Sequence, residues 1–146
     1  MLRTTAKIFI LIGTLTAFSC GSRVRSVALG TVCREPENAT VKVEAYFRLP
    51  QVSDWSGDDD GTGEYRLLLV ERPTGGGSFI TATVSGTASN EPNRIAALPA
   101  SYTYDDVRIN TDSGRTVSAG EKLAITGHVL KDSKPCILRI EKIETP

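Results

Sequence analysis

The segment 51–64 carries side chains whose types suit ligand binding. Its candidate binding residues are the single tryptophan of the chain and four aspartates: Trp55, Asp54, Asp58, Asp59 and Asp60. Loops of this length are often functional. Trp55 would then offer a stacking surface to a sugar or a peptide, and the carboxylates would attract a cationic partner. The alternative is that Trp55 covers the mouth of the folded domain while the aspartates keep the loop soluble.

Other chemistry finds little support in the residue types. Calcium prefers clustered oxygen ligands. When this segment is aligned with a helix-loop-helix calcium loop, Leu67 falls at the position of the bidentate glutamate. We therefore expect no metal and no cofactor. The only histidine, His128, falls on the polar face of a predicted strand, and neither GxSxG nor HExxH occurs. The sequence therefore predicts a protein that is not an enzyme.

The N-terminus has the layout of a secretory signal peptide. Arg3 and Lys7 precede the mostly apolar segment 8–18, which small residues follow. Eleven helical residues rise about 16 Å, roughly half of a bilayer's hydrocarbon core, so a permanent membrane span is not expected. We predict that residues 1–19 are a removable signal peptide. Without its two basic residues the chain keeps 15 basic and 17 acidic groups, which argues against a nucleic-acid partner.

The end of this segment reads Ala17-Phe18-Ser19-Cys20-Gly21. It resembles a bacterial lipoprotein signal, in which a cysteine after a small residue is lipidated and becomes the new N-terminus. The resemblance implies lipidation at Cys20, a tether over residues 20–30, and an exported protein held on a membrane, facing the periplasm or the cell surface. Ala17 and Ser19 also satisfy ordinary signal peptidase, which would give a secreted product.

Lipidation of Cys20 would leave an even pair of cysteines, Cys33 and Cys136. In an oxidising compartment an even pair is expected to be joined, so we predict a disulfide between them. The alternative is that both are small buried hydrophobic residues, as free cysteines often are.

Period-two alternation of apolar and polar residues predicts an all-β domain over residues 31–146. We expect Tyr46, Tyr65 and Phe79 on the sheet surface, Asp105 and Asp106 in a turn, and a short helical turn at 95–98. The predicted strands are 41–49, 65–72, 78–84, 106–110, 116–117, 123–129 and 136–140.

The run 114–129 resembles the approach to the fourth strand of the oligonucleotide/oligosaccharide-binding (OB) fold, with Gly127 at the bend that closes its barrel. The resemblance implies a small five-to-six-stranded OB-like barrel whose variable helix lies between the third strand and the final pair. Its first-to-second and fourth-to-fifth strand loops would frame a ligand. An immunoglobulin-like β-sandwich is the alternative fold.

These features together predict a non-enzymatic, lipid-anchored binding or accessory module of the bacterial cell envelope, whose partner is an envelope protein or a glycan. The alternative function is a secreted or periplasmic β-sandwich that inhibits or adheres to another protein.

Overall fold

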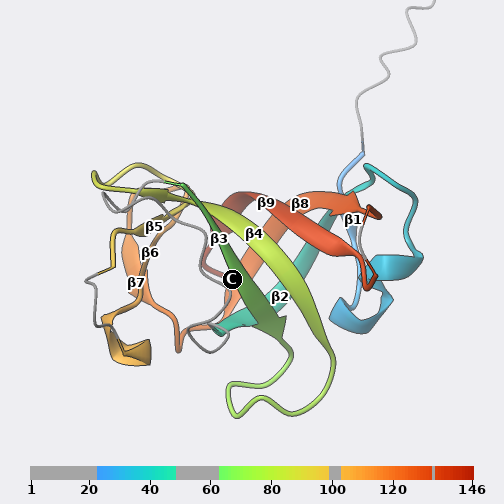
Figure 1. Cartoon of the computed structure of the whole chain (residues 1–146), viewed down its shortest axis with the longest axis horizontal. Helices are drawn as coiled ribbons and strands as arrows, with labels where there is room; N and C mark the ends of the chain where they lie inside the picture. Colours follow the sequence, from blue (N-terminus) through green and yellow to red (C-terminus); the bar gives the residue numbers. More distant parts are fainter. Residues whose placement is uncertain (1–22, 49–62, 99–102, 133) are drawn as a thin grey trace, which may run out of the picture.

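The computed structural model of the chain describes residues 23–48, 63–98, 103–132 and 134–146, and this part is built mostly of strands (Figure 1). The all-β prediction is confirmed. In chain order the elements are β1 (Arg25–Ser26), the 3-10 helix η1 (Leu29–Arg34), β2 (Thr40–Arg48), β3 (Gly63–Val70), β4 (Phe79–Thr87), β5 (Arg94–Ala96), the 3-10 helix η3 (Tyr104–Asp106), β6 (Arg108–Asn110), β7 (Thr116–Ser118), β8 (Leu123–Leu130) and β9 (Ile137–Glu144).

Five of these strands close into a barrel. β2 pairs antiparallel with both β3 and β8, and β3 pairs antiparallel with β4. β4 then pairs parallel with β9, which returns antiparallel to β8. The circuit β2-β3-β4-β9-β8 is the arrangement expected for an OB-like barrel, so that prediction is confirmed. The sandwich alternative is wrong, because two packed sheets would not be joined into one hydrogen-bonded circuit.

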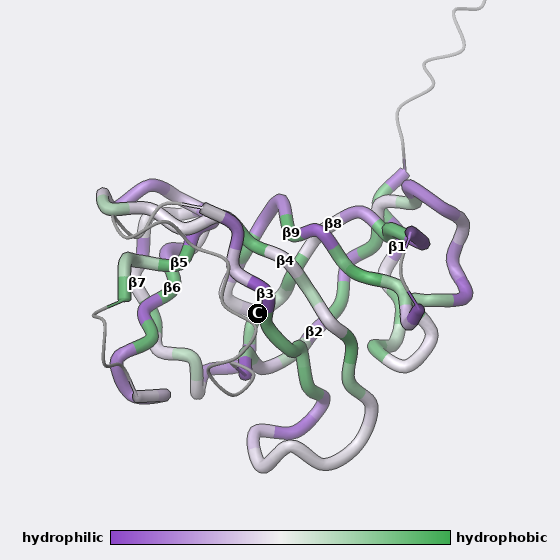
Figure 2. Tube along the Cα trace, viewed as in Figure 1, coloured by the Kyte–Doolittle hydropathy of each residue, from purple (hydrophilic) through white to green (hydrophobic). Residues whose placement is uncertain are grey.

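The alternation seen in the sequence builds the barrel core. On β2, Val41, Val43 and Phe47 are buried, whereas Glu44 and Arg48 are exposed. Figure 2 shows hydrophobic stretches along the strands of the barrel, as this pattern requires. Burying one face of each strand fixes the register, because a slip by one residue would turn the apolar side chains outward.

The surface aromatic residues were only partly predicted. Phe79 is 65% exposed at the start of β4, and Tyr46 is half-buried. Tyr65 was expected on the surface, but it points into the core and is 1% exposed. Leu67 and Leu69 share its face of β3, and the continuous apolar run from Leu67 gave no alternation from which that face could be read.

Gly127 lies at an irregularity in the pairing of β8 with β9. The register shifts between Thr126 and Gly127, which pair with Lys142 and Ile140, so Glu141 is an extra residue in β9. A Cβ at Gly127 would collide with the main-chain carbonyl of Arg139. Glycine is required here because the backbones leave no room for a side chain, which agrees with the role predicted for it in closing the barrel.

The insertion between β4 and β8 forms a three-stranded extension at one end of the barrel (Figure 1). β5 pairs parallel with the end of β4, and β6 and β7 follow antiparallel. The prediction of a helical turn at 95–98 is wrong. Ile95 belongs to β5, because β5 forms hydrogen bonds with β4 and β6 on either side and the Ile95 side chain is fully buried in the core. Asp105 and Asp106 lie in η3, where Asp106 accepts the Thr103 main-chain N–H.

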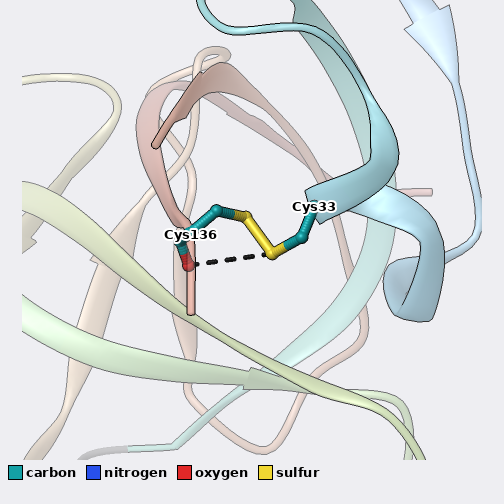
Figure 3. The surroundings of a disulfide bond; sticks show 2 residues. All are labelled: Cys33 and Cys136. Carbon is teal, nitrogen blue, oxygen red and sulfur yellow. Dashed lines mark hydrogen bonds between the residues drawn. A yellow bond between two sulfur atoms is a disulfide. The ribbon is translucent and has the colours of Figure 1, made fainter. Parts of the chain in front are cut away.

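A disulfide fastens the N-terminal segment to the barrel. Cys33 in η1 is joined to Cys136, which directly precedes β9, so the predicted pairing is confirmed (Figure 3). The dashed line in Figure 3 marks the 3.9 Å approach of Cys33 Sγ to the Cys136 carbonyl oxygen, a contact and not a hydrogen bond, since oxidised sulfur carries no proton. Arg25 and Ser26, from the predicted tether, pair with β2 as β1.

Candidate ligand-binding face

The predicted site residues fall in different parts of the chain. Trp55 and the four aspartates of segment 51–64 lie outside the described residues, as do Cys20 and the predicted signal peptide. The strands that flank the loop are described, and Arg48 on β2 pairs with Leu68 on β3. The described surface that adjoins this segment is the outer face of the barrel at β3.

The outer face of β3, β4 and β9 holds a polar row. Core-facing residues alternate with outward ones on each strand, so Arg66, Thr83 and Arg139 all point outward. The register places Arg66 opposite Thr83, and Thr83 beside Arg139 on the parallel strand. Two arginines thus flank one hydroxyl, and the strands that carry them are separated by about 10 Å, twice the strand spacing.

The two arginines of the row, like most arginines in the described part of the chain, make no salt bridge. Within the described part of the chain, neither Arg66 nor Arg139 has an ion-pair partner, although both are exposed. The carboxylates of Glu64 and Glu141 are two residues away on the same strands, and Glu141 Oε1 is 2.8 Å from His128 Nε2. The row therefore presents positive charge to solvent.

The hydroxyl between the arginines is buried without a partner. Thr83 is 8% exposed, and its Oγ1 makes no hydrogen bond. A buried polar group left in this state costs about 1–3 kcal/mol, and in native proteins it calls for an explanation. Its cross-strand neighbours on this face are the two arginines, so their side chains are in position to cover it. The hydroxyl can donate to an oxygen placed between them.

An apolar row runs parallel to the polar one. Leu68, Thr81 and Ile137 occupy neighbouring strands in register, and all three are half-buried. Phe79, two residues before Thr81 on β4, extends this row with an exposed aromatic ring. We call the polar and apolar rows together the β3–β4–β9 face. It combines cationic, hydroxyl and apolar groups on one continuous surface.

A separate groove of about 740 Å³ lies between the β1–η1 segment and β2. At this groove Lys122 Nζ donates to Glu44 Oε2 at 2.6 Å, and this hydrogen bond and the lysine charge lower the pKa of Glu44. Glu71 Oε2 accepts the main-chain N–H of Ser78 at 3.0 Å. Lys122 and Glu44 of the groove thus satisfy one another, and Glu71 is held by a main-chain N–H, in contrast to the arginines of the β3–β4–β9 face.

His128 lies on β8 with its ring bound on both sides. Its Nδ1 is 3.2 Å from Thr40 Oγ1, and its Nε2 is 2.8 Å from Glu141. Among the described residues, no group of three or more His, Cys, Asp or Glu side chains is arranged to hold a metal ion. The ring therefore acts as a link between β2, β8 and β9 in the geometry observed.

The polar row was not found from the sequence. Arg66 and Arg139 are 73 positions apart, and each looks like an ordinary solvent-facing strand residue. Only the strand order, with β4 between β3 and β9, brings them to either side of Thr83. The alternation gave their outward direction, but no signal in the sequence gave the pairing.

No protein-family model, curated protein or solved structure matches the chain. In the described residues, no helix is both long and apolar enough to cross a membrane. The class of protein is therefore defined by architecture alone: a small, disulfide-linked, OB-like β-barrel with a three-stranded extension.

Proposed function

We propose that the protein is a non-enzymatic, lipid-anchored binding or accessory module of the bacterial cell envelope. In this proposal residues 1–19 direct export, Cys20 carries the lipid, and the barrel faces the periplasm or the cell surface. The partner is an envelope protein or a glycan, bound at the β3–β4–β9 face.

The disulfide is the observation that best supports export. Disulfides persist in oxidising compartments and are rare in the cytosol, and here one joins Cys33 to Cys136. The third cysteine, Cys20, is the one that the lipoprotein-like signal would modify. One account therefore explains all three cysteines of the chain.

The position of the N-terminal segment supports an anchor close to the barrel. β1 begins at Arg25, five residues after Cys20, and pairs with β2. A lipid on Cys20 would hold the barrel within a few residues' length of the membrane. β1 and η1 lie at the opposite end of the barrel from the β5–β7 extension (Figure 1), which would then point away from the membrane.

The binding role is supported by the architecture and by the face itself. OB-like barrels use the surface of their second and third strands for ligands, and β3 and β4 hold those places here. This surface carries arginines without ion-pair partners in the described residues, together with exposed apolar groups. Arginine and aromatic residues are enriched among the residues that dominate binding energies.

The anchor is tested by fractionation. We would produce the full chain and the variant Cys20→Ala in a Gram-negative host, with Ser22→Ala as a matched control beside the cleavage site. We expect the unaltered chain and Ser22→Ala in the detergent-soluble membrane fraction, and Cys20→Ala released from it. Retention of Cys20→Ala on the membrane would contradict the proposal, and an unaltered chain in the soluble periplasmic fraction would favour a secreted protein.

A further inference from the structure

We propose that Arg66, Thr83 and Arg139 form a binding site for the carboxylate groups of an acidic polysaccharide. This inference rests on the proposed binding role of the β3–β4–β9 face and names the chemistry of its ligand. The three residues come from three neighbouring strands and lie in one row across the outside of the barrel.

The charge of the site selects an anion. Each guanidinium presents planar, paired N–H donors that match the two oxygens of a carboxylate. Neither Arg66 nor Arg139 has a carboxylate partner in the described chain, so neither must give up an ion pair there to bind a ligand. Glu64, two residues before Arg66 on β3, and Glu141, two residues after Arg139 on β9, lie on one side of the positive row.

The hydroxyl of Thr83 gives the site its centre. It is more than nine-tenths buried and has no hydrogen-bond partner, although it lies on the outward side of β4. A ligand oxygen seated between the two arginines would accept this hydroxyl's proton in a hydrogen bond. The unsatisfied hydroxyl then gains an acceptor when the arginine side chains that flank it turn to hold the ligand.

The surroundings favour a polysaccharide over a peptide. At Thr83 and Arg139, β4 and β9 pair on both sides and leave no free strand edge there for a peptide to extend, whereas in the described residues β3 pairs with β2 only from Leu68 to Val70. β4 instead presents Thr81, Thr83 and Ser85 outward, as successive hydroxyls that suit a polyhydroxyl ligand. The exposed ring of Phe79 offers a stacking surface to the apolar faces of sugar rings.

The test uses the acylated protein purified from membranes in mild detergent. Isothermal titration would compare hexagalacturonate with its fully methyl-esterified form, which keeps the sugars and removes the charge. We expect the acid to bind and the ester to bind at least tenfold more weakly. Binding should also weaken as salt rises, because the site is exposed.

Substitutions test which residues bind the carboxylate. Arg66→Gln and Arg139→Gln should each weaken binding about tenfold or more, as expected for losing a charge-assisted pair. Arg115→Gln, at the β6–β7 turn of the extension, removes the same charge away from the face and should leave affinity unchanged. Thr83→Val should weaken binding several-fold while its melting temperature stays the same or rises, because it removes an unsatisfied buried hydroxyl.

Other results would overturn the assignment. Equal binding of acid and ester, or unchanged affinity in Arg66→Gln and Arg139→Gln, would show that these arginines do not hold a carboxylate. Binding of hexaglutamate with the same variant profile, in place of hexagalacturonate, would assign the anion to a peptide. Failure to bind any of these ligands by a protein that is acylated and membrane-bound would refute this inference and leave the anchor standing.

Discussion

Removing the Cys33–Cys136 disulfide should lower the stability of the barrel by a large and calculable amount. The two cysteines are 103 positions apart, so their bond ties the first described segment to the last strand across most of the domain. A cross-link over a loop of this length reduces the entropy of the unfolded chain by an amount worth about 4.7 kcal/mol. For a domain of this size, that corresponds to a fall of roughly 20 °C in melting temperature.

The side chains themselves add little to this figure. Cys136 is 6% exposed and packs at the edge of the core, whereas Cys33 is exposed. Replacing both by serine therefore removes mainly the constraint on the unfolded state, plus a modest packing loss at Cys136. The full loss of stability should appear when either cysteine is replaced, because the remaining cysteine alone forms no cross-link.

The assay is thermal unfolding followed by circular dichroism, on the unaltered chain, Cys33→Ser, Cys136→Ser and the double variant. We expect both single variants to melt far below the unaltered chain and the double variant to melt no lower than Cys136→Ser. Reductant should lower the melting temperature of the unaltered chain alone. Additive losses in the double variant, or no effect of reductant, would refute the reasoning and leave two independent packing residues.

Three further predictions concern the barrel and its extension. Gly127→Ala should cost about 1–3 kcal/mol in urea unfolding, because the new Cβ meets the Arg139 carbonyl; an unchanged midpoint would contradict the close approach. Tyr104→Phe should cost about 1–2 kcal/mol, since its one hydroxyl proton is shared between the main-chain carbonyls of Phe47 and Ala119; no loss would show that this hydrogen bond does not stabilise the extension. The pKa of Asp112 is lowered by a hydrogen bond from the Asn93 side-chain amide and by Lys142. The contribution of the Asp112 carboxylate to folding stability is therefore present above about pH 4 and is lost as pH falls further. Asp112→Asn should therefore melt lower than the unaltered chain at pH 7 and converge with it in acid, and a constant difference would contradict that linkage.

Control measurements separate these effects from misfolding. Each variant should keep the far-ultraviolet circular dichroism spectrum of the unaltered chain at low temperature, because none removes a strand. For Tyr104→Phe the ring remains, so a loss reports the hydroxyl, whose pKa is raised by burial.

The fold was predictable because the alternation is strong where the barrel is built. Thr40–Arg48 reads clearly as one buried and one exposed face, and the glycine at 127 marks the closure. Prediction failed where local pattern is ambiguous. Tyr65 lies in a strand with apolar residues on both faces, and Ile95 lies in a three-residue strand that is set by its pairing with β4 and β6.

The candidate site was less predictable than the fold. The sequence drew attention to Trp55 and its neighbouring aspartates, which lie outside the described residues, so their binding role stays a prediction. The row of Arg66, Thr83 and Arg139 depends on the strand register and on the strand order, in which β9 rather than β8 lies beside β4. Such long-range pairing carries no local signature, because each residue is an ordinary choice for the outer face of its own strand.

The lipid anchor is tested most directly by the intact mass of the protein extracted from host membranes, measured with and without reductant. The account predicts a chain that begins at Cys20, is heavier by acyl groups, and gains two hydrogens on reduction of Cys33–Cys136. An unmodified chain recovered from the soluble fraction would contradict the anchor and leave an odd thiol on an exported protein.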